Sequence, residues 1–142
     1  MTDNVTNYAT YPSLADRTVF ITGGADGIGS AMVHHFARQG SKVAFVDKNA
    51  EYAERTIAAC VESGVAHAPL FYEVDLVDIS ALREACAAAI RDLGGVTVLV
   101  NNAASDDRHD WREVTPEYFD DRIHVNLRHY FFAIQALAPQ MI

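Results

Sequence analysis

TGGADGIG, residues 22–29, is the stretch of sequence that decides the fold. It follows a short apolar run over residues 18–21 and opens a helical pattern that continues to residue 39. A strand that turns through glycines into a helix brings backbone N–H groups and the positive end of the helix dipole close to a bound phosphate. The sequence therefore predicts a pyrophosphate site, with these candidates: Gly23, Asp26, Gly27, Ile28 and Gly29. The alternatives are a tight turn without a ligand and, for Asp26, a role only as the helix cap.

An acidic residue follows the second apolar run at a position that suits a nucleotide. Asp47 lies close to the ~20-residue offset at which an acid accepts hydrogen bonds from the adenosine ribose. Because a carboxylate repels a 2′-phosphate, Asp47 favours NAD over NADP as the cofactor. The cation of Lys48, the next residue, offsets part of that repulsion. The alternative for Asp47 is a cap of the loop that follows it.

Two further polar groups end the third and fourth apolar runs. Asp75 and Leu76 end the third, where an acid can accept from an adenine amino group while an apolar side chain flanks the ring. Asp75 is equally typical of a turn. Asn101 and Ala103 belong to the sequence NNAA at the end of the fourth run, where small residues allow a close approach of the backbone to a cofactor. Without the glycine turn upstream, NNAA would be a plain Asx turn.

The chain alternates between strand-length apolar runs and helical patterns. The strands are expected at residues 18–22, 42–47, 70–75 and 96–101, and the helices at about 27–39, 50–63, 79–93 and 116–142, the last with a bend near Asn126 and another before Pro139. Near-continuous apolar strands separated by helices predict an α/β fold with a parallel sheet covered on both faces. Right-handed crossovers give the strand order 3-2-1-4 of a Rossmann-like, doubly wound sheet, of which this is half. Residues 1–13 are expected to form a flexible arm and residues 14–142 an incomplete NAD-binding domain.

Composition and charge exclude several classes of partner. Half of the 142 residues are hydrophobic and the formal net charge is −8. That charge argues against nucleic acid and anionic membranes as partners, because both require a basic face on the protein. No apolar run approaches the ~20 residues of a membrane span, and the N-terminus lacks a signal-peptide pattern. These features predict a cytoplasmic protein.

Cysteines and histidines give no sign of a metal site. Cys60 and Cys86 fall on expected helices without metal-like spacing, which predicts reduced packing residues. His34–His35 are adjacent, and His124 and His129 are five residues apart. Neither pair places two imidazoles on one helix face at i, i+4, so no metal is expected.

Together these motifs resemble the short-chain dehydrogenase/reductase family. The resemblance covers about residues 14–142 and includes the glycine turn, the acids at 47 and 75, the NNAA run, and Asn126 in the sequence VNL. It implies an NAD(P)-dependent oxidoreductase that moves a hydride between a nicotinamide and an alcohol or carbonyl. It also implies that Asn126 is a catalytic residue that positions a water in a proton relay.

The sequences NNAASDDRH, residues 101–109, and VNLRH, residues 125–129, resemble members of that family that oxidise aldoses to lactones. A polyhydroxylated substrate needs several hydrogen-bond donors and acceptors, which Asp106, Arg108 and His109 would supply. The alternative is a solvated polar loop, or one closed by an internal Arg–Asp pair.

The family's chemistry also requires a tyrosine with a lysine four residues later, and an upstream serine. None of the six tyrosines has a lysine at that spacing, and the only lysines are Lys42 and Lys48. The chain is therefore expected to stop after the fourth strand and its following helix and to be inactive alone. The alternative function is a non-catalytic dinucleotide-binding or interaction module.

Such a half-fold leaves surfaces without neighbours. The strand at 96–101 becomes an open edge, and the helical pattern at 116–142 has an apolar side. The residues expected on that side are Tyr118, Ile123, Leu127, Phe131 and Ile134. Bare edges and apolar patches promote association. We therefore expect a homo-oligomer, an exchanged element or a fragment of a longer product.

Overall fold

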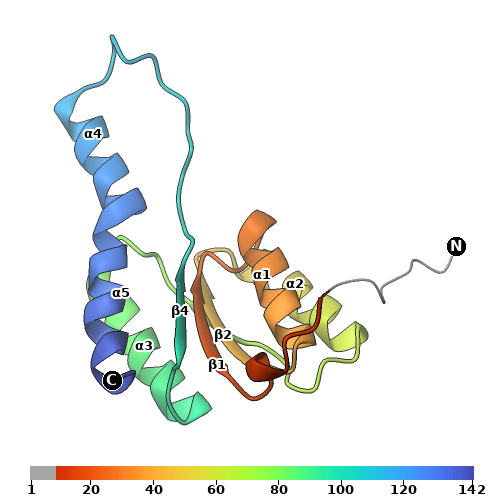
Figure 1. Ribbon diagram of the computed structural model, residues 1–142. Coiled ribbons are helices and arrows are strands. Elements are labelled where there is room, and N and C mark those ends of the chain that lie inside the picture. Colours follow the sequence, from red (N-terminus) through yellow and green to blue (C-terminus); the bar gives the residue numbers. More distant parts are fainter. Residues whose placement is uncertain (1–8) are drawn as a thin grey trace, which may run out of the picture.

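The computed structural model describes residues 9–142, and its centre is a four-stranded parallel sheet (Figure 1). The strands are β1 (Thr18–Thr22), β2 (Lys42–Asp47), β3 (Leu70–Glu73) and β4 (Val98–Asn101). Their order, β3-β2-β1-β4, confirms the predicted 3-2-1-4 topology. Among the described residues β4 pairs only with β1, so it forms one edge of the sheet, as expected.

Helices cover both faces of the sheet. The helices α1 (Gly27–Arg38) and α2 (Ala50–Glu62) lie on one face, and α3 (Ile79–Leu93) and α5 (His129–Leu137) lie on the other (Figure 1). Alternate strand residues supply the two cores: Val19 and Ile21 pack with α1 and α2, whereas Phe20 packs with α3 and α5. A strand buried on both faces must be apolar along its whole length, which accounts for the continuous apolar run at β1.

Three of the helices begin at side-chain caps. The side chains of Asn49, Asp78 and Thr115 accept hydrogen bonds from backbone N–H groups in the first turns of α2, α3 and α4 (Pro116–Ile123). Each cap pairs one of the N–H groups that a helix leaves without an internal partner.

Two strands are shorter than predicted, and side chains explain both differences. β3 ends at Glu73 rather than at residue 75, because the Asp75 carboxylate accepts a hydrogen bond from the Val77 N–H at 3.1 Å and turns the chain. β4 begins at Val98 rather than at residue 96. The side chain of Gln140 instead pairs with both the N–H and the carbonyl of Val96, at 3.0 and 2.8 Å.

The C-terminal helical segment departs from a regular α-helix at the two places where the sequence predicts a bend. α4 (Pro116–Ile123) passes into a π-helical segment, η3 (His124–Arg128), before α5 begins. Asn126 lies at the centre of this π-helical segment, which widens the helix locally; such segments are frequent at functional sites. A 3₁₀ turn, η4 (Ala138–Gln140), follows α5 and contains Pro139.

The expected N-terminal arm falls mostly outside the described residues, since the structure describes none of residues 1–8. Its last part contacts the domain. The side chain of Gln39 pairs with the Tyr11 N–H and with the Ala9 carbonyl, both at 2.9 Å. A short 3₁₀ turn, η2 (Pro12–Leu14), then leads into β1.

Cys60 and Cys86 are both buried and unpaired, on opposite faces of the sheet. Burial raises the pKa of the Cys86 thiol to about 12 and also raises the pKa of Cys60. Both therefore act as apolar packing residues. Over residues 9–142, no helix has the length and apolar character needed to cross a bilayer. In the same range no cluster of His, Cys, Asp and Glu side chains is arranged to hold a metal ion.

Candidate functional site

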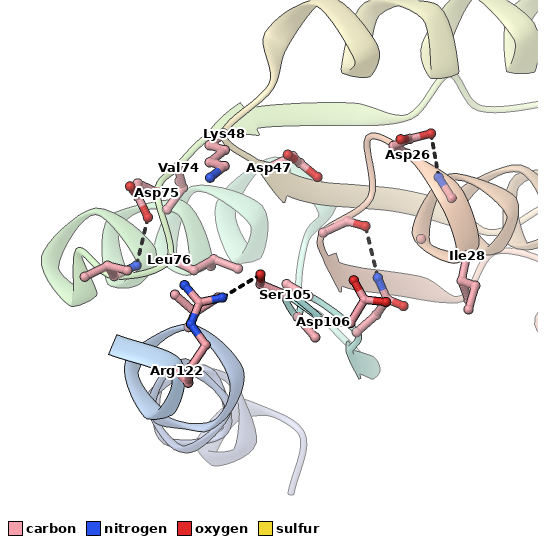
Figure 2. A pocket seen from close by; sticks show the side chains of 18 of the residues that line it. Asp26, Ile28, Asp47, Lys48, Val74, Asp75, Leu76, Ser105, Asp106 and Arg122 are labelled. Carbon is pink, nitrogen blue, oxygen red and sulfur yellow. Dashed lines mark hydrogen bonds between the residues drawn. The ribbon is translucent and has the colours of Figure 1, made fainter. Parts of the chain in front are cut away.

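A cleft of about 800 Å³ opens at the carboxyl ends of the strands (Figure 2). It lies where the order of the sheet reverses between β1 and β4, the place at which open α/β sheets bind ligands. Eleven predicted site residues line it: Gly23, Asp26, Gly27, Ile28, Gly29, Asp47, Lys48, Asp75, Leu76, Ala103 and Asp106. The structure thus brings most of the predicted site together.

The three glycines predicted to bind phosphate have different reasons to be glycine. A Cβ on Gly29 would lie 1.7 Å from the carbonyl oxygen of Gly23, and a Cβ on Gly23 would lie 2.8 Å from the Cα of Ala103. Gly23 and Gly29 are therefore required by packing within the protein. Gly27 has a φ of 54°, and a Cβ there would meet nothing within 4 Å. The open space in front of Gly27 fits a phosphate group held against the start of α1.

Asp26 and Ile28 flank that open space. The Asp26 carboxylate accepts a hydrogen bond from the Gly27 N–H at 2.7 Å, so it caps α1, the alternative that the sequence left open. The side chain of Ile28 is 71% exposed although it is aliphatic. An aliphatic side chain so exposed at the rim of a cleft suits contact with a ligand.

Asp47 ends β2 and links it to the glycine turn. Its carboxylate accepts from the Ala25 N–H and from the Asn49 N–H, both at 3.1 Å. These two bonds fix the side chain at the rim of the cleft, beside Lys48 (Figure 2). The loop-capping role and a role toward a ligand are compatible, because a carboxylate has about four acceptor positions.

Asp75 and Leu76 form the wall of the cleft beyond Lys48 (Figure 2). One oxygen of Asp75 accepts from the Val77 N–H, which is the turn role that the sequence left open. Leu76 presents an apolar side chain to the same end of the cleft. An apolar side chain next to a carboxylate suits a nucleotide base.

Asn101 ends β4 and Asn102 follows it, and only Asn102 lines the cleft. The Asn102 amide donates to the carbonyls of Thr22 and Gly23 at 3.1 and 3.0 Å and so joins β4 to the glycine turn. Asn101, the predicted residue, instead donates to the carbonyl of Tyr130 on α5 at 3.4 Å. Successive side chains of a strand point to opposite faces, so only one of the two can reach the turn.

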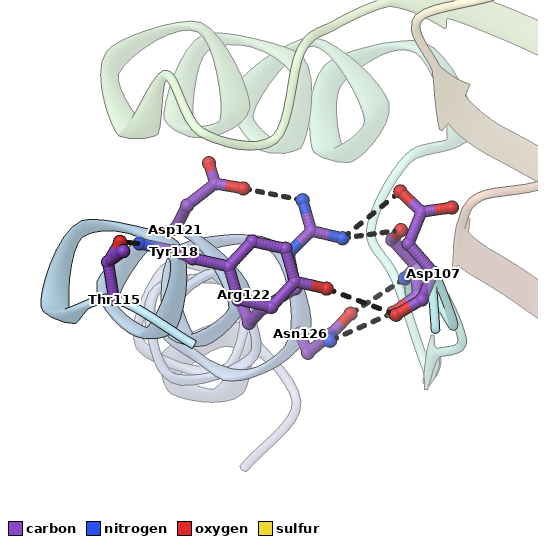
Figure 3. A network of polar contacts seen from close by, with 7 residues as sticks. Asp107, Thr115, Tyr118, Asp121, Arg122 and Asn126 are labelled. Atoms are coloured by element: carbon purple, nitrogen blue, oxygen red, sulfur yellow. Dashed lines mark hydrogen bonds and ion pairs between the residues drawn. The ribbon is translucent and has the colours of Figure 1, made fainter. Parts of the chain in front are cut away.

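Asn126 does not line the cleft but holds a residue that does. Its amide accepts from the Ser105 N–H at 2.7 Å and donates to the Ser105 carbonyl at 3.0 Å (Figure 3). Ser105 lines the cleft directly after the NNAA run. The side chain of Asn126 therefore acts on the cleft through the backbone of Ser105.

Sequence reasoning missed Arg122 as a residue of this site. Its guanidinium lines the cleft and donates to the Ser105 hydroxyl at 2.7 Å, to Asp107 at 3.4 Å and to Asp121 (Figure 3). The bond to Asp121 holds the pKa of Arg122 above its ordinary value. The sequence left open an Arg–Asp pair within the loop, and Arg112 does pair with Asp110 there at 2.7 Å. Arg122, in contrast, comes from the helix. Only the fold brings these two segments together.

The three predicted substrate residues are separated by that network. Asp106 lines the cleft, whereas Arg108 and His109 do not. The ring of His109 stacks on Tyr118, with ring centroids 4.4 Å apart, and the Tyr118 hydroxyl donates to the Asp107 carbonyl at 3.1 Å. These contacts direct the loop away from the cleft after Asp106, so Tyr118 faces the loop rather than the expected apolar side of the helix.

The sequence and the fold both match known dehydrogenases. The family described as short chain dehydrogenase matches residues 17–142. The chain is 50% identical over 133 residues to a probable galactose dehydrogenase of Rhizobium meliloti (strain 1021), covering 92% of this chain and 51% of that protein. It is 44% identical over 133 residues to D-xylose 1-dehydrogenase of Caulobacter vibrioides, covering 94% of this chain and 51% of that protein.

The chain also superimposes on about half the length of solved structures. A dehydrogenase/reductase from Sinorhizobium meliloti 1021 superimposes with a TM-score of 0.84 at 31% identity, covering 89% of this chain and 50% of that one. A short-chain dehydrogenase/reductase from Serratia marcescens also gives 0.84, at 32% identity, covering 92% of this chain and 53% of that one. The chain thus spans about half the length of the curated relatives that it matches.

Proposed function

Because the chain belongs to the short-chain dehydrogenase/reductase family, we propose that it is the cofactor-binding part of an NAD-dependent oxidoreductase acting on an aldose. The observation that carries the proposal is the cleft in which the open space at Gly27 and the fixed carboxylate of Asp47 lie together. A dinucleotide needs both a place for its pyrophosphate and an acceptor for its ribose hydroxyls.

Each part of the cleft suits one part of that cofactor. The start of α1 at Gly27 would hold the pyrophosphate, and Asp47 would accept from the adenosine ribose. Asp75 and Leu76 would meet the adenine, and Ala103 would lie beside the nicotinamide ribose. When bound, the nicotinamide accepts or supplies the hydride; the protein groups bind it and orient it.

An aldose is the substrate class that the sequence and the relatives favour. Relatives that are 50% and 44% identical are named as galactose and D-xylose dehydrogenases. Asp106 lies in the cleft and offers acceptors to sugar hydroxyls. Arg108 and His109 lie on the loop that follows and would contact a sugar only if that loop moves. Asn126 would serve the reaction by fixing Ser105 beside the cofactor.

The preference for NAD over NADP is tested by changing one carboxylate. Asp47→Ala removes the charge that would repel a 2′-phosphate, and it also removes two loop-fixing hydrogen bonds. We expect NAD to bind about tenfold more weakly and the preference for NAD over NADP to shrink. Asp26→Ala, which removes an acid of the same cleft, should leave the preference unchanged. Equal selectivity in wild type and Asp47→Ala would exclude Asp47 from the ribose site.

The function itself is tested by calorimetric titration of the 142-residue chain with NAD and then with NADP. Saturable binding of NAD is the expected result. A folded chain that binds neither dinucleotide would overturn the proposal for this chain. Oxidation of galactose and xylose is measured separately, with NAD present.

A second function, a non-catalytic dinucleotide-binding or interaction module, is favoured by one observation. No tyrosine of the sequence is followed by a lysine four residues later. Without that pair the reacting oxygen has no general acid or base, a loss of about 10²–10⁴-fold in rate. NAD binding with no turnover of any aldose supports the module, and turnover by this chain excludes it.

We also propose that the protein associates with itself and is cytoplasmic. A row of exposed apolar side chains runs along the C-terminal helical segment: Phe119, Ile123, Leu127, Phe131 and Ile134. A second copy would cover this row, which forms one helix face. The two buried, unpaired cysteines suit a reducing compartment.

A further inference from the structure

Arg122 lies at the end of the cleft where Asp75 follows β3. It lines the cleft together with Leu76 and Val77, on the side formed by the C-terminal helical segment. Figure 2 shows its guanidinium at the same end as Asp75 and Lys48, away from Ile28 and the start of α1. If the pyrophosphate lies at Gly27, this end of the cleft is where the base of a nucleotide would extend.

Both terminal nitrogens of this guanidinium are already engaged, whereas its Nε is buried and has no hydrogen-bond partner within residues 9–142. One terminal nitrogen donates to the Ser105 hydroxyl and to Asp107, and the other donates to Asp121. An arginine recognises a phosphate by pointing two parallel N–H groups at it. Since both terminal nitrogens of Arg122 already have partners and two of these partners are carboxylates, the residue does not present a phosphate-binding fork to the cleft.

What Arg122 offers a ligand is its flat face. One face of the guanidinium lies over the ring of Tyr118, with the central carbon 5.3 Å from the ring centroid. The side chain is still 24% exposed, and Arg122 is one of the residues that line the cleft. Guanidinium planes stack favourably on aromatic rings and on nucleic-acid bases.

We propose that the guanidinium plane of Arg122, backed by Tyr118 and fixed by Ser105 and Asp121, forms the wall of an adenine subsite opposite Leu76. The inference rests on the proposed function and deepens it, because it says which end of the same cleft binds the adenine and which residue contacts it. A plane fixed before the ligand arrives costs little entropy when the base binds. The subsite selects a flat base, and it discriminates poorly among phosphates.

The test compares two ligands that differ by the base. The wild-type chain and its Arg122→Met and Arg122→Lys variants are titrated with ADP and with ribose 5-diphosphate, which lacks the adenine. Both variants should bind ADP about tenfold more weakly and ribose 5-diphosphate as well as the wild type does. Lysine keeps the charge but has no plane, so it should not rescue the binding of ADP.

Two further variants guard against a simple loss of folding. Ser105→Ala leaves the arginine in place but removes the 2.7 Å hydrogen bond that orients it. This variant should bind ADP about threefold more weakly than the wild type. Arg112→Met makes the same change on an exposed arginine that pairs with Asp110 outside the cleft, and should leave ADP binding unchanged. Circular dichroism of each variant confirms that it is folded.

Three results overturn the inference. Unchanged ADP affinity in Arg122→Met removes Arg122 from the subsite. An equal loss for ADP and ribose 5-diphosphate assigns it a purely structural role, and full rescue by lysine shows that charge rather than the plane matters. A wild-type chain that binds neither NAD nor ADP would overturn the proposed function and this inference with it. That result is seen in the wild type, so it can be distinguished from the three results above, which are seen in the variants.

Discussion

The side-chain amide of Asn126 pairs with both backbone polar groups of Ser105, a residue 21 positions earlier in the chain. Together with Tyr118 and Arg122, which also bind residues 105–107, it forms a row at i, i+4 and i+8 on one helix face. The row fixes the loop that leaves β4 to the C-terminal helical segment. The cleft wall at Ser105 therefore depends on a helix remote in sequence.

Asn126→Ala should loosen this loop. The change leaves the N–H and the carbonyl of half-buried Ser105 without their partner, which costs about 1–2 kcal/mol of the free energy of unfolding. Asn126→Asp keeps the acceptor for the Ser105 N–H but lacks the donor to the Ser105 carbonyl. It should therefore lose less of the free energy of unfolding than Asn126→Ala does. Urea unfolding monitored by circular dichroism measures both. Gln135→Ala, which removes an amide that pairs with an exposed arginine, is the control. Equal stability of Asn126→Ala and wild type would contradict the role assigned to this amide.

Gly29 and Gly27 should respond differently to a single methyl group. Gly29→Ala places a Cβ on the carbonyl of Gly23, so the turn must distort, and we expect a destabilisation of roughly 3 kcal/mol or more. Gly27→Ala meets no atom and pays only for its positive φ, about 1–2 kcal/mol, but it fills the space proposed for a phosphate. Thermal unfolding and NAD titration of the two variants separate these effects. A Gly27→Ala variant that keeps full NAD affinity would show that the phosphate does not lie there.

The fold was predictable because the strands carry their signal locally. The apolar run at 18–21 and the turn at 22–29 identify a strand, a glycine turn and a helix without any long-range information. The caps at Asn49 and Asp78 are equally local. The strand order then follows from the handedness of the crossovers. The strand ends were less predictable, since Val96 is withheld from β4 by Gln140, 44 residues away.

The candidate site was predictable only where binding a nucleotide requires a particular residue type at a particular position. The glycines and Asp47 belong to that group, although the packing reason for Gly29 was not visible in the sequence. Arg122 was missed because nothing local distinguishes an arginine on the surface of a helix from one that faces a cleft. The choice between Asn101 and Asn102 depends on strand register, which fixes the face that each side chain occupies.

The exposed apolar row on the C-terminal helical segment predicts an effect of charge on association. Leu127 and Phe131 are 58% and 63% exposed, so glutamate at either position should leave the fold intact and weaken self-association about tenfold or more. Val61→Glu introduces the same charge at a 54% exposed position on α2 and serves as the control. Sedimentation equilibrium measures the oligomeric state. A wild-type chain that is monomeric at high concentration would exclude this face as a self-association surface.

The buried imidazole of His129 predicts how stability changes with pH. His129 is fully buried on α5 with its ring edge-on to Tyr130, and within residues 9–142 neither ring nitrogen has a hydrogen bond of normal geometry. Burial lowers the pKa of His129 from its ordinary 6.5, and the carbonyl of Val125 opposes this shift. The unfolded chain therefore takes up this proton at a higher pH than the folded chain does. Its contribution to stability is complete above pH 6.5 and is lost as the pH falls toward the folded pKa.

His129→Leu should remove that part of the pH dependence. Between pH 7.5 and pH 5.5 the wild type should lose more of its free energy of unfolding than the variant, by urea unfolding at each pH. Burial also lowers the pKa of His34, with help from the charges of Arg38 and His35, so some loss should remain in the variant. His124→Gln, at an exposed position of η3, serves as the control for the removal of a histidine. Parallel curves for wild type and His129→Leu would mean that the imidazole takes up its proton in the folded chain as readily as in the unfolded one.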